Sequence, residues 1–303
     1  MHTEFTYDAV LGSSSRAAWQ LDDVMPLTAE LDFTRPFLPE ALARCGSAVG
    51  LSQPELLVLN QIRGHEYLAM FGLVEEFILP FVLDHARPLL NGDDYRVRAL
   101  LQFAGEEAKH IHLFRRFRST FNRGFGEEID VIGPADAISA KILAHDPLAI
   151  ALVVLQIEWM TQAHYLEMVR DDTGLDPLFK SLLKHHWMEE AQHAKLDTLM
   201  VEALADGRDD AAIDSAFGEY LEIGGFLDGG LRAQTQINLA ALERRIGRNL
   251  PALQHAALLD QQHQAARWTF LGSGMAHPQF RASLTRLSPR LIERLDAVAP
   301  NFA

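Results

Sequence analysis

The sequence predicts an all-α protein, and three features carry this prediction. From residue 51 onward, apolar residues recur at spacings of three and four, as they do on one face of a helix. No segment shows the alternation of apolar and polar residues that is typical of a strand. Turn-forming pairs such as Asn91-Gly92 and Asp206-Gly207 separate the helical stretches. The expected architecture is two long helical hairpins joined by a crossover, with a further helical layer beside them.

The first fifty residues are expected to form an irregular arm, since 12–15 has loop composition and Pro36 and Pro39 interrupt any helix. Ser52 followed by Glu55 has the pattern of a helix N-cap and first turn. The predicted helices cover about 52–86, 94–121, 135–143, 148–170, 177–204, 209–245, 250–271 and 277–297, with a possible break in the 209–245 helix at the glycine pairs 224–225 and 229–230. We expect one domain, 1–303, composed of the arm 1–50, a bundle 51–206 and a C-terminal layer 207–303.

Composition excludes several classes of protein. The chain has 41 acidic and 27 basic residues and a net charge of −14 without a basic patch, which argues against a nucleic-acid partner. A single cysteine, Cys45, rules out an internal disulfide framework and a zinc site built on several thiolates. The chain shows no signal-peptide pattern and no long uncharged apolar run. We therefore expect a cytoplasmic protein without a membrane segment, in which any metal is held by Glu, Asp and His.

Two Glu-x-x-His motifs are the main chemical signal. Glu107 and His110 lie on the second long helix, and Glu190 and His193 lie on the fourth. Residues three apart share a helix face, so each motif can direct a carboxylate and an imidazole to one point. In each antiparallel hairpin the mirror position of the motif glutamate also holds a carboxylate. Glu158 is that carboxylate in the second hairpin.

In the first hairpin the mirror position falls on the doublet Glu75-Glu76, and only one of the two can face the centre. We expect Glu76, because the doublets that contain Glu107 and Glu190 both use their second member. These carboxylates lie within strongly apolar segments, where a bare charge costs several kcal/mol. Two divalent cations would neutralise four carboxylates.

A third imidazole enriches the predicted site. His186 precedes Glu190 by four residues and lies on the same stripe of its helix, with His185 as the competing candidate. Asp197, four residues after His193, is placed to accept the second N–H of that imidazole. The site would then contain four carboxylates and three histidines.

These motifs resemble those of the p-aminobenzoate N-oxygenase family of non-haem diiron oxygenases. The resemblance covers roughly residues 20–205 and includes the segment 31–42 before the first long helix. It implies a ferritin-like fold, two iron ions and activation of O₂ to oxidise a small, usually aromatic, amine with electrons from an external donor. The metal ligands that it implies are Glu76, Glu107, His110, Glu158, His186, Glu190 and His193. Manganese remains open as a substitute for iron.

Other functions remain open at this stage. A diiron hydroxylase, a desaturase or a radical-generating subunit would use the same ligands on another substrate. A metal-storage protein would also use them, although the extra C-terminal layer favours a covered pocket or a dimer surface over a cage. A homodimer is expected from its frequency among oligomers.

Overall fold

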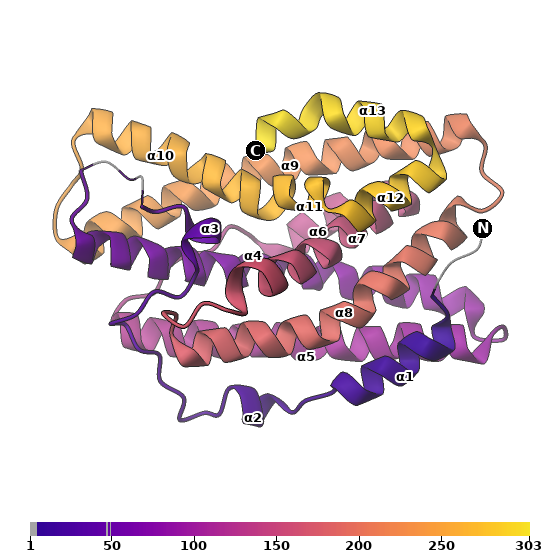
Figure 1. Cartoon of the computed structure of the whole chain (residues 1–303), viewed down its shortest axis with the longest axis horizontal. Coiled ribbons are helices and arrows are strands. Elements are labelled where there is room, and N and C mark those ends of the chain that lie inside the picture. Colours follow the sequence, from indigo (N-terminus) through magenta and orange to yellow (C-terminus); the bar gives the residue numbers. More distant parts are fainter. Residues whose placement is uncertain (1–4, 47, 49) are drawn as a thin grey trace.

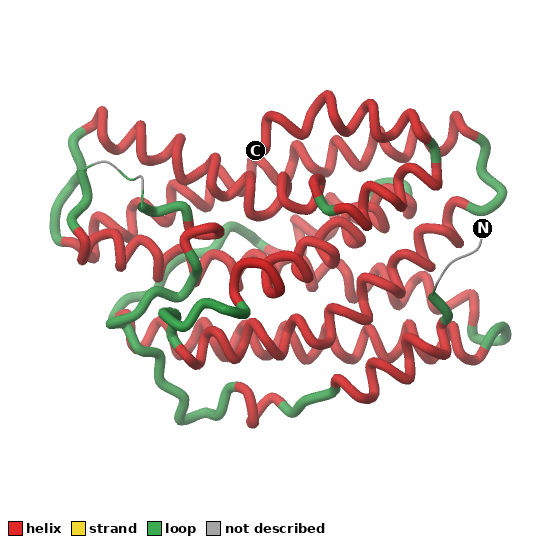
Figure 2. The backbone as a smooth tube through the Cα atoms, in the orientation of Figure 1, coloured by secondary structure: helices red, strands yellow, loops and turns green. Residues whose placement is uncertain are grey.

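The computed structural model describes residues 5–46, 48 and 50–303, which form helices and loops without strands (Figure 2). The prediction of an all-α fold is therefore confirmed for these residues. The α-helices are α1 (Tyr7–Ala17), α2 (Leu21–Val24), α3 (Glu40–Ala43), α4 (Gln53–Ala86), α5 (Asp94–Phe125), α6 (Ala135–Leu143), α7 (Pro147–Ala163), α8 (Pro177–Ala205), α9 (Asp210–Ile246), α10 (Ala252–Arg267), α11 (Ser273–Ala276), α12 (Pro278–Leu287) and α13 (Pro289–Val298). Two π-helical segments, η2 (His164–Val169) and η3 (Trp268–Gly272), extend α7 and α10.

The bundle consists of the hairpins α4–α5 and α7–α8 (Figure 1). Helix α4 begins with the predicted cap, in which the Ser52 backbone N–H donates to Glu55 Oε2 at 2.7 Å. Helix α5 begins after Asp93, whose carboxylate accepts from the backbone N–H of Tyr95 at 2.9 Å, and ends at Gly126 in a left-handed conformation (φ 85°). The segment 126–146 crosses from one hairpin to the other. Two helical hairpins with one long crossover make the ferritin-like four-helix arrangement that the sequence predicts.

The C-terminal residues form a second helical layer. Helix α9 packs against α4 and α7, and α10 packs against α9 (Figure 1). Helix α9 runs unbroken through Gly224-Gly225 and Gly229-Gly230. The predicted possibility of a helix break at these glycine pairs is therefore wrong. Packing of the long helix against two others compensates for the low helix propensity of glycine. None of the described helices is both long and apolar enough to cross a lipid bilayer.

The N-terminal arm is more regular than predicted. Residues 12–15, expected to be a loop, lie within helix α1, which begins where the Thr6 hydroxyl accepts the backbone N–H of Ala9 at 3.3 Å. Helix α1 lies against α5 and α8 (Figure 1), and Ser14 is buried in that contact. Tertiary packing thus overrides the weak helix propensity of glycine and serine in this segment. Residues 31–39 are non-helical, as expected, and the short helix α3 begins directly after Pro39.

Candidate metal centre

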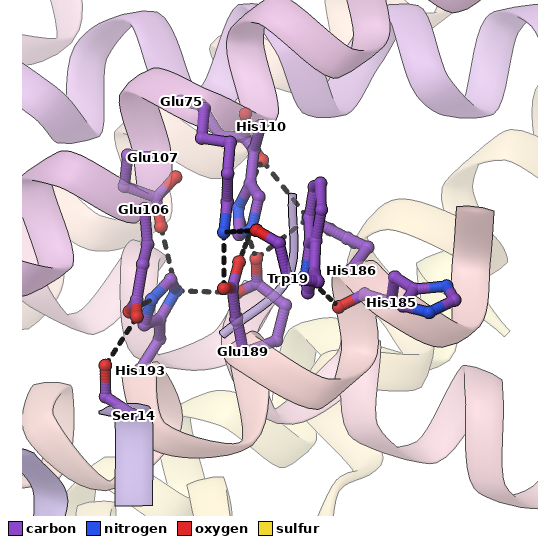
Figure 3. Close-up of polar contacts among 12 residues, drawn as sticks. Ser14, Trp19, Glu75, Glu106, Glu107, His110, His185, His186, Glu189 and His193 are labelled. Carbon is purple, nitrogen blue, oxygen red and sulfur yellow. Dashed lines mark hydrogen bonds and ion pairs between the residues drawn. The ribbon is translucent and has the colours of Figure 1, made fainter. Parts of the chain in front are cut away.

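Each of the four bundle helices contributes to one buried polar cluster, and Figure 3 labels members from α4, α5 and α8. All members are at most 3% exposed, although apolar side chains surround them. The cluster comprises Glu75 from α4, Glu107 and His110 from α5, Glu158 from α7, and His186, Glu190 and His193 from α8. Six of these seven residues are ligands expected from the sequence.

The first half of the cluster contains Glu75, His110, His186 and Glu190, with one ligand atom of each within 4.8 Å of the others. The imidazole Nε2 of His186 lies 2.8 Å from Glu190 Oε1 and 3.2 Å from Glu75 Oε1. The Nδ1 atom of His110 lies 3.0 Å from Glu190 Oε1. Three helices therefore meet at this point.

The second half contains Glu107, His110, Glu190 and His193, again with ligand atoms within 4.8 Å. The Nδ1 atom of His193 lies 2.8 Å from Glu107 Oε1 and 3.1 Å from Glu190 Oε2. His110 and Glu190 belong to both halves, so the two potential cation positions are adjacent. Glu190 presents Oε1 to the first half and Oε2 to the second, so it could hold an ion in either position.

Glu158 lies beside Glu190 at the same level of the bundle. Burial and the charge of Glu190 raise the pKa of the Glu158 carboxyl well above its usual range. Its Oε2 atom has no hydrogen-bond partner among the described residues. Glu158 is therefore available as a fourth carboxylate.

The prediction of Glu76 is wrong, and Glu75 takes its place. Glu76 points outward, where its Oε1 accepts a hydrogen bond from Arg115 Nη2 at 2.7 Å. Successive helix positions differ by about 100° in direction, so only one member of the doublet faces the cluster. The analogy with the other doublets failed because Glu107 and Glu190 are aligned by histidines three residues later, whereas α4 has no such histidine. Of the two adjacent histidines, His186 faces the cluster. His185 does not, and its Nδ1 atom lies 2.7 Å from the carbonyl oxygen of Ser181.

Two further carboxylates, not expected from the sequence, contact the Nε2 atoms of His110 and His193, on the side of each ring that faces away from the cluster centre. His110 Nε2 lies 2.8 Å from Glu189 Oε2, and His193 Nε2 lies 2.9 Å from Glu106 Oε2. Each histidine of one hairpin is thus bound by a carboxylate of the other hairpin. A carboxylate that accepts the Nε2–H leaves the Nδ1 lone pair directed at the cluster. The signal was present in the doublets Glu106-Glu107 and Glu189-Glu190, whose first members reach across to the facing helix.

Asp197 does not accept the second N–H of His193, contrary to expectation. Neither of its carboxylate oxygens has a hydrogen-bond partner among the described residues, because Glu106 already occupies His193 Nε2. Burial raises the pKa of the Asp197 carboxyl well above its usual range, although the nearby His193 partly opposes this.

The N-terminal arm closes the outer side of the cluster (Figure 3). The Ser14 hydroxyl donates to Glu106 Oε1. The Trp19 ring stacks on His110, with 5.9 Å between centroids and 12° between planes, and its Nε1–H donates to the His185 carbonyl at 2.8 Å. The Lys109 ammonium donates to the Trp19 carbonyl at 3.2 Å and to Glu189. The arm therefore contacts Glu106, which binds His193, and the ring of His110 itself.

The donor set fits two metal ions. Several cluster atoms are buried without a hydrogen-bond partner among the described residues: Glu75 Oε2, both oxygens of Glu107, His110 Nδ1, Glu158 Oε2 and Glu190 Oε1. Buried polar atoms of this kind require a partner. Ligands about 2.1 Å from an octahedral ion are about 3 Å apart, close to the separations described above. Carboxylates with imidazoles and without thiolates suit iron or manganese.

The protonation of the metal-free cluster supports the same conclusion. Burial, reinforced by the charge of Glu107, raises the pKa of Glu75 to about 8. Burial lowers the pKa of His110, but the hydrogen bond with Glu189 and the negative charge of the nearby Glu190 outweigh it and raise that pKa well above its ordinary value. Protons thus balance the carboxylates when no metal is bound. Metal binding must displace them and will depend on pH.

An apolar cavity of about 480 Å³ lies beside the cluster, between α4, α7, α9, η3 and the segment 131–133. Phe71 connects the two, because its side chain lines the cavity and its ring contacts His186 at 5.3 Å between centroids. Val74 and Ile157 also line the cavity, each one residue before a cluster carboxylate. The cavity has the size of a small-molecule site.

No protein-family model matches this chain, and no curated protein matches it in sequence. Similar solved structures include variants of an R2-like ligand-binding oxidase with an aerobically reconstituted Mn/Fe cofactor. One has a TM-score of 0.48 at 15% identity, with 88% of this chain and 97% of that chain covered. Another has a TM-score of 0.47 at 16% identity, with coverages of 86% and 93%. Values this low establish neither family nor activity, so the p-aminobenzoate N-oxygenase resemblance stays a prediction.

Proposed function

We propose that this chain is an O₂-dependent oxidase or oxygenase that uses two iron ions, or manganese in place of iron, to oxidise a small amine. One observation carries the proposal: three carboxylates and three imidazoles converge on two adjacent positions beside an apolar cavity, and the buried Glu158 lies next to Glu190 as a fourth carboxylate. Bound ions of this type supply the redox chemistry that activates O₂. The electrons would come from an external donor.

The chain's own residues set the geometry of this centre. Glu75, Glu107, His110, Glu158, His186, Glu190 and His193 would hold the ions. Glu189 and Glu106 fix the orientation of His110 and His193, which keeps both Nδ1 atoms directed inward. Phe71 and Phe77, both at most 3% exposed, line the cavity and exclude water from the substrate side.

The choice of an amine rests on the resemblance and on the third histidine. His186 lies with Glu75 and Glu190 in one half of the cluster, and this extra imidazole is the most specific element shared with the arylamine oxygenases. A hydroxylase or desaturase would use the same centre on a carbon atom. Product analysis with candidate amines and hydrocarbons separates these reactions.

Metal storage is the competing function from another class. The apolar cavity beside the cluster favours catalysis, since storage needs no organic-ligand site. Assembly of the chain into a large cage with many irons per chain would support storage instead.

Anaerobic loading with Fe²⁺ followed by mixing with O₂ tests the proposal. We expect about two irons per chain and an absorbance change on mixing with O₂ that candidate amines accelerate or quench. Glu75→Gln should lower iron occupancy, whereas the matched variant Glu76→Gln should retain it because Glu76 binds Arg115 at the surface. Protein that binds no iron, or an iron-loaded form that is inert to O₂, would refute the proposal.

A further inference from the structure

The lining of the apolar cavity restricts the molecules that it can accept. Its described residues are all aliphatic, aromatic, methionine or glycine, and none of their side chains carries a charge or an oxygen or nitrogen atom. Phe71, Phe77 and Phe270 provide aromatic surface, and Met70 and Met160 provide flexible apolar surface. A neutral aromatic molecule is complementary to these walls.

A charged group would find no partner inside this cavity. A carboxylate that enters loses its hydration, and no described lining residue offers a cation or a side-chain N–H in return. This matters because the arylamine substrates of the resembled family include p-aminobenzoate, which carries a carboxylate opposite its amine.

Charged side chains gather instead in a smaller cavity of about 290 Å³ on the α5 side of α4. Leu73, Val131 and Ile132 line both cavities and form the wall between them. The smaller cavity holds Arg118 and the Glu76–Arg115 ion pair, so both signs of charge are present there. Phe114 lines this smaller cavity and its ring contacts His186 at 5.0 Å between centroids, so both cavities lie next to the cluster and the charged side chains line only the smaller one.

We propose that the 480 Å³ cavity selects an uncharged, apolar substrate, namely a neutral aromatic amine without a carboxylate. The inference rests on the proposed function only in calling this ligand a substrate. The selection itself follows from the lining and is measurable as binding alone.

Methyl 4-aminobenzoate and p-aminobenzoate form a matched pair of probes, because they share ring and amine and differ in charge. Binding of each to the full-length protein can be measured by isothermal titration calorimetry at pH 7.5. We expect the ester to bind about 100-fold more tightly. Equal affinities, or tighter binding of the acid, would overturn the inference.

Variants of Leu227, a half-buried residue of α9 that lines the cavity, locate the binding. Leu227→Trp should fill the cavity and abolish binding of the ester, whereas Leu221→Trp, on the same helix but outside the lining, should not. Leu227→Arg should strengthen binding of the acid about tenfold by supplying a counter-charge. Ester binding that survives Leu227→Trp would contradict the assignment, and so would acid binding that depends on Arg118 in an Arg118→Gln variant.

Binding and turnover fail separately in this design. If the ester binds as expected but the iron-loaded protein oxidises neither probe, the proposed function fails and the selectivity of the cavity stands. If amines are oxidised but the acid is preferred, the cavity inference fails and the oxidase function stands.

Discussion

The two sides of the metal cluster differ sharply in chemistry. The outer side, under the N-terminal arm, is a network of polar contacts in which Glu106 and Glu189 hold the histidines. Ser14 and Trp19 then hold that network in place. The inner side lies next to an apolar cavity, with Phe71 between His186 and the cavity, and the described lining offers no polar side chain. Under the proposed function, the outer side would fix the metal ligands and the inner side would receive the organic substrate.

Truncation of Trp19 tests the outer side most severely. Trp19 is 8% exposed and stacks on His110, so Trp19→Ala should lower the free energy of unfolding by about 3 kcal/mol. It should also weaken iron binding, because His110 loses its packing partner. Trp19→Phe is the control that retains an aromatic ring. Chemical denaturation with and without iron measures both effects, and an unchanged midpoint would show that the arm does not support the centre.

Replacement of Glu189, whose carboxylate binds His110 Nε2, should lower metal affinity and leave the apolar cavity unchanged. Glu189→Gln weakens the hydrogen bond that orients His110, and removal of such partners typically costs 10- to 100-fold in metal affinity. Leu227→Trp, on the inner side, should leave metal affinity unchanged. Competition with a metal chelator measures both variants. If Glu189→Gln and Leu227→Trp lowered metal affinity equally, the outer and inner sides of the cluster would not differ in their effect on the metal.

The stability of the metal-free protein should fall as pH rises from about 5 to about 8. The folded-state pKa of Glu75 is about 8, above its ordinary 4.5, so the folded protein retains a proton that the unfolded chain releases. The pKa values of His110, His186 and His193 are also raised, which acts in the same direction. We expect the melting temperature to drop by about 5 °C over this range. Iron-loaded protein should lack this decline, because cations replace the protons. A melting temperature of the metal-free protein that rises with pH would show that the pKa values of Glu75 and the cluster histidines are not raised in the folded state.

Removal of the Ser14 hydroxyl should have the smallest effect. Ser14→Ala leaves Glu106 Oε1 with Gln102 as its remaining donor, at 2.9 Å. The expected cost is about 1 kcal/mol in metal affinity or in stability. Ser15→Ala, on the same helix but bonded only to the Leu11 carbonyl, is the matched control. If Ser14→Ala and Ser15→Ala gave the same metal affinity and the same stability, the hydrogen bond from Ser14 would not be needed to position Glu106.

The sequence contained most of the fold, because helical periodicity and turn residues are local signals. The two hairpins, the crossover and the cap at Ser52 follow directly from them. Helix α1 was missed because its glycine and serines have low helix propensity, and only the docking of α1 on α5 and α8 makes it helical.

The sequence predicted which residues of one helix share a face, but it did not predict which face of each helix is turned toward the cluster. Spacing within one helix aligned Glu107 with His110, and Glu190 with His193, and the structure brings these four together. The choice between Glu75 and Glu76 depends on how α4 is rotated about its axis, and this is set by packing against α5, α6 and α9. For the same reason the roles of Glu106 and Glu189 appear only when two helices are seen face to face.

The crossed pairing of histidines and carboxylates has a consequence for how the protein assembles. Because His110 is held by Glu189 and His193 by Glu106, neither hairpin alone contains a completed metal-binding half. A nascent chain that has emerged only as far as the crossover offers incoming ions two carboxylates and one unsupported imidazole. Under the proposed function, binding of the two metal ions would therefore follow docking of the hairpins, so that metal uptake would be a late step in maturation and would report that both hairpins have docked.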